Sequence, residues 1–282
     1  MTQKSNICAD TVRGFGEEWA AFDQTALDPS EHERAFSSYF SIFPFQNLPP
    51  QPEGFDLGCG SGRWAALMVN RVAKLHCIDP SEEALGVARK RLQHQPNAEF
   101  HLADAENIPL ADESQDFGYS LGVLHHIPDT ESAMRGCVRK LKPGAPFLVY
   151  LYYNFDNRPL WFRALWRASD LVRRIVCRLP FTMRRFLTGI VAVLVYYPLA
   201  RLSLGLERIG VAVENFPLSA YRHYSLYVMR TDALDRFGTR LERRFSRSEI
   251  RAMMERCGLR EIVFRDGVPY WVACGRRADN AA

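Results

Sequence analysis

The sequence lacks the cysteine patterns that indicate a metal site or a disulfide framework. Its seven cysteines form no CxxC pair and their number is odd, so we expect neither a zinc site nor a disulfide framework. The first residues, MTQKSNICADTVRGFG, are polar and lack the apolar run of a signal peptide. We therefore expect a cytoplasmic protein with reduced, buried thiols and no metal.

The sequence also lacks the two common glycine motifs that bind nucleotide phosphates. A short apolar run leads into DLGCGSG, in which Gly58, Gly60 and Gly62 alternate with other residues. A phosphate loop needs GxxxxGK followed by Ser or Thr, and a dinucleotide fingerprint needs GxGxxG. A glycine turn between a strand and a helix still lets a ligand approach the backbone at the sheet edge. The spacing therefore favours an adenosyl ligand without a phosphate.

Strand and helix patterns alternate along the first half of the chain. Helical patterns at 62–72, 81–93 and 131–141 lie between strand patterns at 54–57, 74–79, 98–104, 117–127 and 145–153. A capped helix at 244–259 and two further strand patterns, 260–267 and 269–277, follow much later. We predict an α/β, Rossmann-like fold: a seven-stranded, mostly parallel sheet with helices on both faces and a helical insert after the fifth strand.

Composition divides the chain into four segments. The proline-rich LPPQPEG marks a boundary near residue 48. We expect an N-terminal helical cap over 1–47, a ligand-binding core over 48–157, a basic and apolar helical insert over 158–220, and the C-terminal part of the core sheet over 221–282.

The motifs of residues 54–150, taken in order, resemble the class I S-adenosylmethionine-dependent methyltransferases of the type 11 group. The resemblance implies an enzyme of class EC 2.1.1.- with S-adenosylmethionine as its cofactor. DLGCGSG matches the first family motif, YSLGVLHHIPD the fourth-strand motif and LKPGAPFLV the fifth-strand motif. Two departures are Ala145, where the family usually has a second glycine, and Glu53-Gly54-Phe55, which replaces the usual β-branched pair and predicts a short first strand.

The resemblance also implies which residues bind the cofactor. Asp79, 17 residues beyond Gly62, is expected to accept both ribose hydroxyls. Asp104 is expected to read the adenine amino group, with Ala105 making a backbone contact. The full expected set is Asp56, Gly58, Cys59, Gly60, Gly62, Asp79, Pro80, Asp104, Ala105 and Leu121.

Catalytic residues are less well defined, because a sulfonium donor is already activated and orientation alone can accelerate transfer. His125 and His126 are candidate bases beside the methyl group, with a structural role as the alternative. His223, in YRHYSLYVMR, is a third candidate, with an exposed loop histidine as the alternative. Trp19, Tyr221 and Tyr224 are the candidate substrate residues, with ordinary packing as the alternative for Trp19.

The insert has a larger net positive charge than the whole chain. The segment from Arg158 to Arg208 contains ten arginines and two acidic residues, so its net charge is +8 within a chain of net charge +4. The insert also contains FLTGIVAVLVYYPLA, an uncharged run shorter than the ~20 residues that cross a bilayer. It is either a buried lid helix over an apolar acceptor pocket or a segment that lies on an anionic membrane through 158–208.

Both alternatives favour the same kind of substrate. We expect methyl transfer to a hydrophobic or lipid-linked small molecule, with oxygen as the favoured acceptor atom. The expected location is the cytoplasm, with a peripheral position at the inner face of the membrane if the insert binds lipid. The alternatives are a membrane-associated scaffold with a non-catalytic methyltransferase fold, and a natural-product or RNA methyltransferase. Nucleic acid is the less favoured partner, because the arginines are interleaved with a long aliphatic run.

Overall fold

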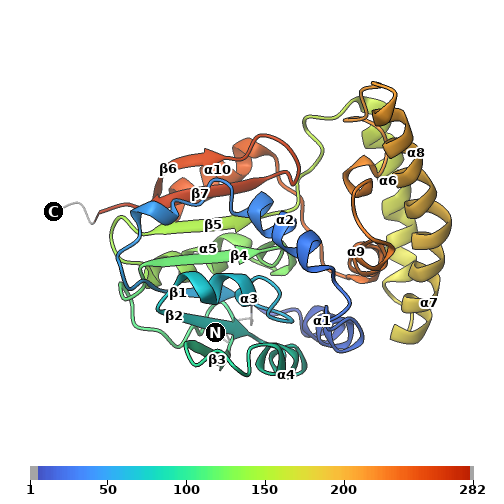
Figure 1. Ribbon diagram of the computed structural model, residues 1–282. Coiled ribbons are helices and arrows are strands. Elements are labelled where there is room, and N and C mark those ends of the chain that lie inside the picture. The colour runs from blue at the N-terminus through green and yellow to red at the C-terminus, as the bar shows by residue number, and fades with distance from the viewer. Residues whose placement is uncertain (1–5, 280–282) are drawn as a thin grey trace, which may run out of the picture. The chain divides into compact units, whose positions relative to one another are not determined.

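The computed structural model describes residues 6–279, which form two compact units (Figure 1). The first unit combines the chain up to residue 24 with 32–154 and the chain from 241 onward. The second unit combines 25–31 with 155–240.

The first unit is built on one seven-stranded sheet in the order β3-β2-β1-β4-β5-β7-β6. Neighbours among β1 to β5 pair in parallel, whereas β7 is antiparallel to both β5 and β6. The predicted Rossmann-like, mostly parallel sheet is therefore confirmed. The strands are β1 (Glu53–Leu57), β2 (Lys74–Asp79), β3 (Ala98–Leu102), β4 (Phe117–Leu121), β5 (Pro146–Tyr150), β6 (Leu259–Phe264) and β7 (Val272–Arg277).

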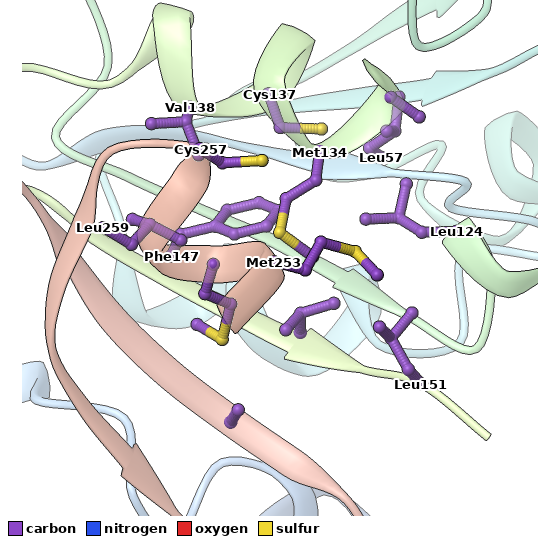
Figure 2. Close-up of a cluster of buried hydrophobic side chains, with 14 of the residues drawn as sticks. Leu57, Leu124, Met134, Cys137, Val138, Phe147, Leu151, Met253, Cys257 and Leu259 are labelled. Carbon is purple, nitrogen blue, oxygen red and sulfur yellow. The ribbon is translucent and has the colours of Figure 1, made fainter. Parts of the chain in front are cut away.

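Two apolar clusters cover the two faces of this sheet. On one face, Phe55, Phe147 and Leu259 pack with Met134 of α5 and Met253 of α10 (Figure 2). On the other face, strand residues pack against α2, α3 and α4. The helices of this unit are α1 (Ala9–Ala21), α2 (Pro29–Tyr39, which begins in the second unit), α3 (Ala65–Met68), α4 (Glu82–Arg91), α5 (Thr130–Lys140) and α10 (Arg247–Arg256).

Several elements are shorter than their sequence patterns predict, and two of them show a local cause. The helix predicted over 62–72 is only α3 followed by a 3-10 turn, because the Asn97 amide donates to the carbonyls of Val69 and Val72, at 2.9 and 3.0 Å, where the helix ends. The fourth strand ends at Leu121 instead of residue 127, because Gly122 adopts φ +81° and turns the chain.

The second unit is helical. It contains α6 (Leu160–Val176), α7 (Phe181–Val191), α8 (Tyr197–Arg208) and α9 (Leu226–Gly238), and a π-helical turn joins α7 to α8. Both α6 and α7 pack against α9. Phe181–Arg208 is therefore one helix of 28 residues, and among the described residues it is long and apolar enough, by length and composition, to cross a membrane. The uncharged run FLTGIVAVLVYYPLA is thus only part of this longer helix.

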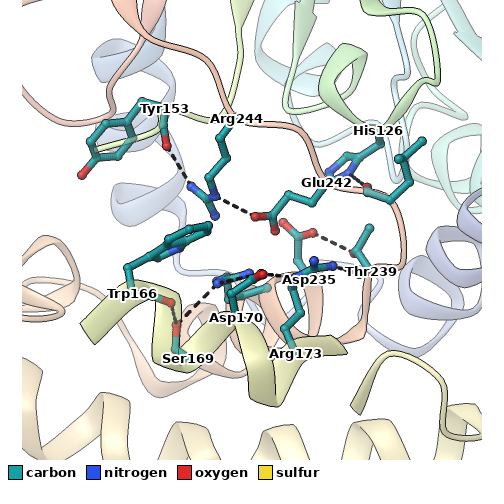
Figure 3. Close-up of polar contacts among 12 residues, drawn as sticks. His126, Tyr153, Trp166, Ser169, Asp170, Arg173, Asp235, Thr239, Glu242 and Arg244 are labelled. Carbon is teal, nitrogen blue, oxygen red and sulfur yellow. Dashed lines mark hydrogen bonds and ion pairs between the residues drawn. The ribbon is translucent and has the colours of Figure 1, made fainter. Parts of the chain in front are cut away.

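The side of α6 that packs against α9 contains a buried ionic group among its apolar contacts. Asp170 is buried and accepts a hydrogen bond from Arg173 at 2.7 Å (Figure 3). It also accepts one from Arg174 at 3.0 Å. Arg236 of α9 lies 3.7 Å from the same carboxylate, and Arg173 donates to the carbonyl of Thr239 at 2.9 Å. Several apolar side chains of α6, among them Leu160, Leu171 and Ile175, are exposed instead.

A matched pair of glycine substitutions tests the packing of α5. A Cβ at Gly136 would lie 2.4 Å from the carbonyl oxygen of Ala105, whereas a Cβ at Gly86 in α4 would meet nothing within 4 Å. Alanine favours a helix over glycine by about 1 kcal/mol. We expect Gly86→Ala to raise the free energy of unfolding by about that amount and Gly136→Ala to lower it, both measured by urea denaturation. A Gly136→Ala protein as stable as Gly86→Ala would contradict the close approach.

Candidate active site

Three glycines form the turn between β1 and α3. Gly58, Gly60 and Gly62 have φ of +75°, +54° and +71°, in the left-handed region that favours glycine. The N–H groups of Gly58 and Cys59 donate to the carbonyl of Ile78 at 2.7 and 3.1 Å. The turn is therefore fixed to the neighbouring strand at the carboxyl edge of the sheet, where α/β folds bind ligands.

Asp79, the last residue of β2, joins this turn to the start of α4. Its Oδ2 accepts the N–H of Gly60 and its Oδ1 accepts the N–H of Ser81, both at 2.9 Å. Burial raises the pKa of Asp79 to about 6, although both hydrogen bonds act to lower it. Each carboxylate oxygen can accept a further hydrogen bond, so the pair suits two adjacent hydroxyls of a ribose.

Asp56 in β1 is a second buried carboxyl group. Burial raises the pKa of Asp56 to about 8, the charge of Asp79 adds to the effect, and the hydroxyl of Tyr119 opposes it. The neighbouring Cys77 thiol and burial raise the pKa of Cys59 well above its usual value. Cys59 therefore keeps its proton and is no nucleophile.

Asp104 shapes a loop after β3 instead of ending the strand. Its Oδ1 accepts the N–H groups of Glu106 and Asn107 at 2.8 and 3.0 Å, an Asx turn. The turn buries Ala105, whose carbonyl lies against Gly136 of α5. The expected contacts of Asp104 and Ala105 with adenine, of Pro80 in the next turn and of Leu121 at the end of β4 stay predictions.

The two adjacent histidines lie in a buried turn after β4. The His125 ring stacks on Tyr152 with centroids 3.8 Å apart, and among residues 6–279 neither of its ring nitrogens has a hydrogen-bond partner. Burial, His126 and Arg244 lower the pKa of His125 well below its ordinary value. The imidazole is thus neutral and weakly basic, which fits a positioning role better than proton abstraction. His126 Nδ1 lies 2.6 Å from the carbonyl oxygen of Leu241 and donates to it.

Helix α1 passes close to the glycine turn and to the histidines. A Cβ at Gly60 would lie 2.8 Å from Nε1 of Trp19, so the indole closely approaches the turn. The ring of Phe15 lies 4.9 Å from that of His126. α1 also packs along α4 (Figure 1). The helix therefore encloses this edge of the sheet and limits the access of water to it.

The segment 241–245 supports the histidine turn and carries no obvious sequence signal. The N–H of Arg243 donates to the carbonyl of His125 at 3.0 Å. Glu242, whose side chain is almost fully buried, accepts from Arg244 at 2.7 Å, and Arg244 also donates to the carbonyl of Tyr153 at 3.1 Å (Figure 3). Arg244 and Tyr153 are 91 residues apart in sequence, so local patterns could not reveal this contact.

The other predicted residues belong to the second unit. His223 is exposed and its Nε2 lies 3.1 Å from Glu207. The ring of Tyr221 lies 5.2 Å from that of Tyr196 and 6.3 Å from that of Tyr224. This aromatic cluster and His223 stay predictions as acceptor or catalytic residues.

The residues of the first unit fit an adenosyl cofactor. The glycine turn offers backbone without side chains, Asp79 offers a carboxylate, and the Ser61 hydroxyl is buried with no hydrogen-bond partner among residues 6–279. A phosphate would meet the two buried carboxyl groups, Asp56 and Asp79, so a phosphate-free adenosyl group is favoured. The fold and site thus define a nucleoside-binding α/β domain.

Comparison with known proteins identifies a methyltransferase domain within the chain. Residues 55–149 match the family described as methyltransferase domain. The chain is 37% identical over 103 residues to a ubiquinone biosynthesis O-methyltransferase of Azoarcus sp. (strain BH72), covering 36% of this chain and 44% of that protein. It is 34% identical over 123 residues to a trans-aconitate 2-methyltransferase of Variovorax paradoxus, covering 43% and 45%. The chain thus matches less than half the length of each relative.

A solved structure shares the fold over nearly the whole chain. One chain of a Haloferax volcanii complex that contains the Trm112 methyltransferase activator aligns with a TM-score of 0.54 at 15% identity, covering 96% of this chain and 99% of that chain. Residues 55–149 therefore match a methyltransferase domain of the type 11 group, within a chain that has the Rossmann-like fold of class I methyltransferases. The predicted resemblance is thereby confirmed for this domain, and S-adenosylmethionine is the cofactor that the domain implies.

The raised pKa of Asp56 predicts how stability depends on pH. Unfolded aspartate has a pKa near 3.8, so between about pH 4 and pH 8 the folded protein keeps a proton that the unfolded chain has lost. Asp56 therefore lowers the free energy of unfolding as pH rises through this window. We expect Asp56→Asn to remove about 1 kcal/mol or more of that decline between about pH 5 and pH 8, measured by urea denaturation.

Asp112→Asn is the control for this experiment. Lys140 lowers the pKa of the exposed Asp112, so its contribution has the opposite sign and is lost only as pH falls below that window. An Asp56→Asn protein whose stability declines as steeply as that of the parent would contradict the assigned burial.

Proposed function

We propose that the protein transfers a methyl group from S-adenosylmethionine to a hydrophobic or lipid-linked small molecule, with oxygen as the acceptor atom, at an anionic membrane surface. The outward apolar face of α6, in the same chain as the methyl-donor domain, carries the proposal. The name of the Azoarcus relative, an O-methyltransferase of ubiquinone biosynthesis, supports oxygen as the acceptor atom.

The chain itself contributes mainly orientation and exclusion of water. The bound cofactor supplies an electrophilic methyl group on a sulfonium. Asp79 would hold the ribose, and the glycine turn would hold the methionyl part by its backbone. His125 stays neutral, and Trp19 and Phe15 of α1 enclose the site. Holding the reactants in line can lower the activation free energy by several kcal/mol, on the order of 7–11 in model reactions.

The outer surface of α6 is suited to a membrane interface. Leu160, Leu171 and Ile175 are 78%, 63% and 67% exposed, and Trp161 lies on the same stripe. Soluble proteins rarely expose a continuous apolar stripe of this kind without a partner. An amphipathic helix in the plane of a membrane buries its apolar face among the acyl chains.

The exposed arginines of the second unit favour an anionic membrane as the partner. Arg167 and Arg174 of α6 and Arg178, two residues beyond its end, are exposed. The two acids of 158–208 are occupied, because Asp170 bonds Arg173 and Glu207 pairs with Arg222. Each arginine near anionic lipid is worth about 1 kcal/mol. Several arginines with an apolar stripe therefore favour anionic lipid over a neutral surface.

We further propose that Phe181–Arg208 lies on the membrane without crossing it. Between Arg185 and Arg201 fifteen uncharged residues rise about 22 Å, which is less than the ~30 Å of the hydrocarbon layer. One side of this helix packs on α9, where Ala192, Tyr196 and Ala200 are buried. Met183, Phe186 and Leu194 are exposed and extend the apolar surface.

Labelled methyl transfer tests the proposed acceptor class. The protein and methyl-labelled S-adenosylmethionine are incubated with the lipids, the water-soluble metabolites or the RNA of one cell extract. We expect label in the lipid fraction and loss of about 10–100-fold of the rate at limiting cofactor in Asp79→Asn, because hydrogen bonds to a charged group are lost. The exposed Asp112→Asn should keep the parent rate.

The other outcomes separate the alternatives. Label in the water-soluble or RNA fraction alone overturns the lipid-linked acceptor. Cofactor binding without label in any fraction favours a non-catalytic scaffold.

Vesicle flotation tests the membrane surface. We expect the protein to float with vesicles that contain phosphatidylglycerol but not with pure phosphatidylcholine, and to be released by salt. Leu171→Glu with Ile175→Glu should abolish flotation, because two charges enter the apolar stripe. Val263→Glu, at a half-exposed apolar position of β6, is the control and should float normally. A parent protein that stays unbound, or forms a dimer lost in the double variant, contradicts the membrane partner.

A further inference from the structure

Three adjacent strands bring two histidines and two glutamates together on one face of the sheet. His76 of β2 pairs in register with Glu99 of the edge strand β3, and Glu53 of β1 pairs with Lys74. Side chains two residues apart along a strand share a face, so His76, His101 and Glu99 lie on the same side. His76 is buried, and Glu99 is about half exposed at the rim.

The polar atoms of this cluster converge on one point. His76 Nδ1 lies 2.9 Å from His101 Nε2 and 3.3 Å from Oε2 of Glu99. His101 Nε2 lies 3.9 Å from the same Glu99 oxygen. In a tetrahedral zinc site with bonds of about 2.0–2.2 Å, neighbouring donor atoms lie roughly 3.3–3.5 Å apart. The three observed separations bracket that value.

We propose that His76, Glu99 and His101 form a site for a divalent transition-metal ion, with zinc as the best match. The donors are His76 Nδ1, His101 Nε2 and Glu99 Oε2, and a water would complete a tetrahedron. Two imidazoles and one carboxylate are a donor set that suits zinc better than magnesium or calcium, which prefer oxygen ligands. The half-exposed Glu99 gives an ion access from solvent.

The neighbours of the donors are arranged as outer-sphere groups of a metal site. His76 Nε2 lies 2.8 Å from Oε1 of Glu53, which fixes the ring so that Nδ1 faces His101. Lys74 Nζ lies 2.8 Å from Oε1 of Glu99, which leaves Oε2 for the ion. A carboxylate on the far nitrogen of a ligating histidine is a recurrent feature of zinc sites.

This site is distinct from the methyl-donor site. His76 precedes Asp79 by three residues, or about 10 Å along the strand, and the alternation of side chains puts the two on opposite faces of β2. A metal here would link the edge strand β3 to β2 and stabilise both. The sequence predicts no metal because its donors come from two strands and contain no cysteine, so the usual spacing rules miss them.

Metal titration of the full chain, after removal of any histidine tag and of bound metals, tests the proposal. We expect one Zn²⁺ per chain by calorimetry and a rise of about 5 °C in melting temperature at saturating Zn²⁺. Co²⁺ should give the visible bands of a tetrahedral site without thiolate charge-transfer bands. That spectrum separates this cluster from the cysteines.

Four variants localise the ion. His101→Asn and Glu99→Gln should lower the Zn²⁺ affinity at least 100-fold and remove the thermal shift. Glu53→Gln, which alters only the outer-sphere partner, should lower the affinity about 10–100-fold. His94→Asn, at an exposed histidine outside the cluster, should bind as the parent does. Unchanged affinity in His101→Asn, thiolate bands with Co²⁺, or no stoichiometric binding by the parent would overturn the proposal and leave a hydrogen-bonded histidine pair.

Discussion

The cofactor edge of the sheet depends on one buried carboxylate, Asp79. Its two oxygens accept the N–H groups of Gly60 and Ser81, so a single side chain fixes both the glycine turn and the start of α4. Burial raises its pKa to about 6, which means that the fold holds this charge against its own preference for a neutral group. Burying the charged carboxylate costs free energy that its two backbone hydrogen bonds do not fully offset. Two ribose hydroxyls could donate further hydrogen bonds and stabilise the charge.

The two units divide the proposed work. The first unit would hold the methyl donor beside α1, where Trp19 approaches Gly60. In the second unit, α6 buries the ion pair of Asp170 and Arg173 and exposes the apolar side chains of Leu160, Leu171 and Ile175. Exposing the apolar stripe of α6 to water is unfavourable, whereas its contact with lipid acyl chains is favourable. An enzyme bound to the membrane can take up a hydrophobic acceptor without first transferring that acceptor into water.

The sequence predicts the sheet and the cofactor turn well because both depend on local patterns. Alternating strands and helices specify the parallel order, and Gly58, Gly60 and Gly62 each need a backbone that favours glycine. What the sequence misses depends on partners far along the chain. Asn97 shortens the helix after the turn, Glu242 and Arg244 support the histidines, and His76 meets His101 across strands. The outward face of α6 is likewise invisible in sequence, since periodicity shows a stripe but not the side that packs.

The most direct test of the methyl-donor site is calorimetric titration of the purified protein with S-adenosylmethionine and then with S-adenosylhomocysteine. We expect both to bind in the micromolar range, one per chain, with release of protons below neutral pH as Asp79, whose pKa lies at about 6, becomes charged beside the ribose. Binding of neither compound, by a protein that remains folded, would contradict the assignment of this sheet edge as a methyl-donor site.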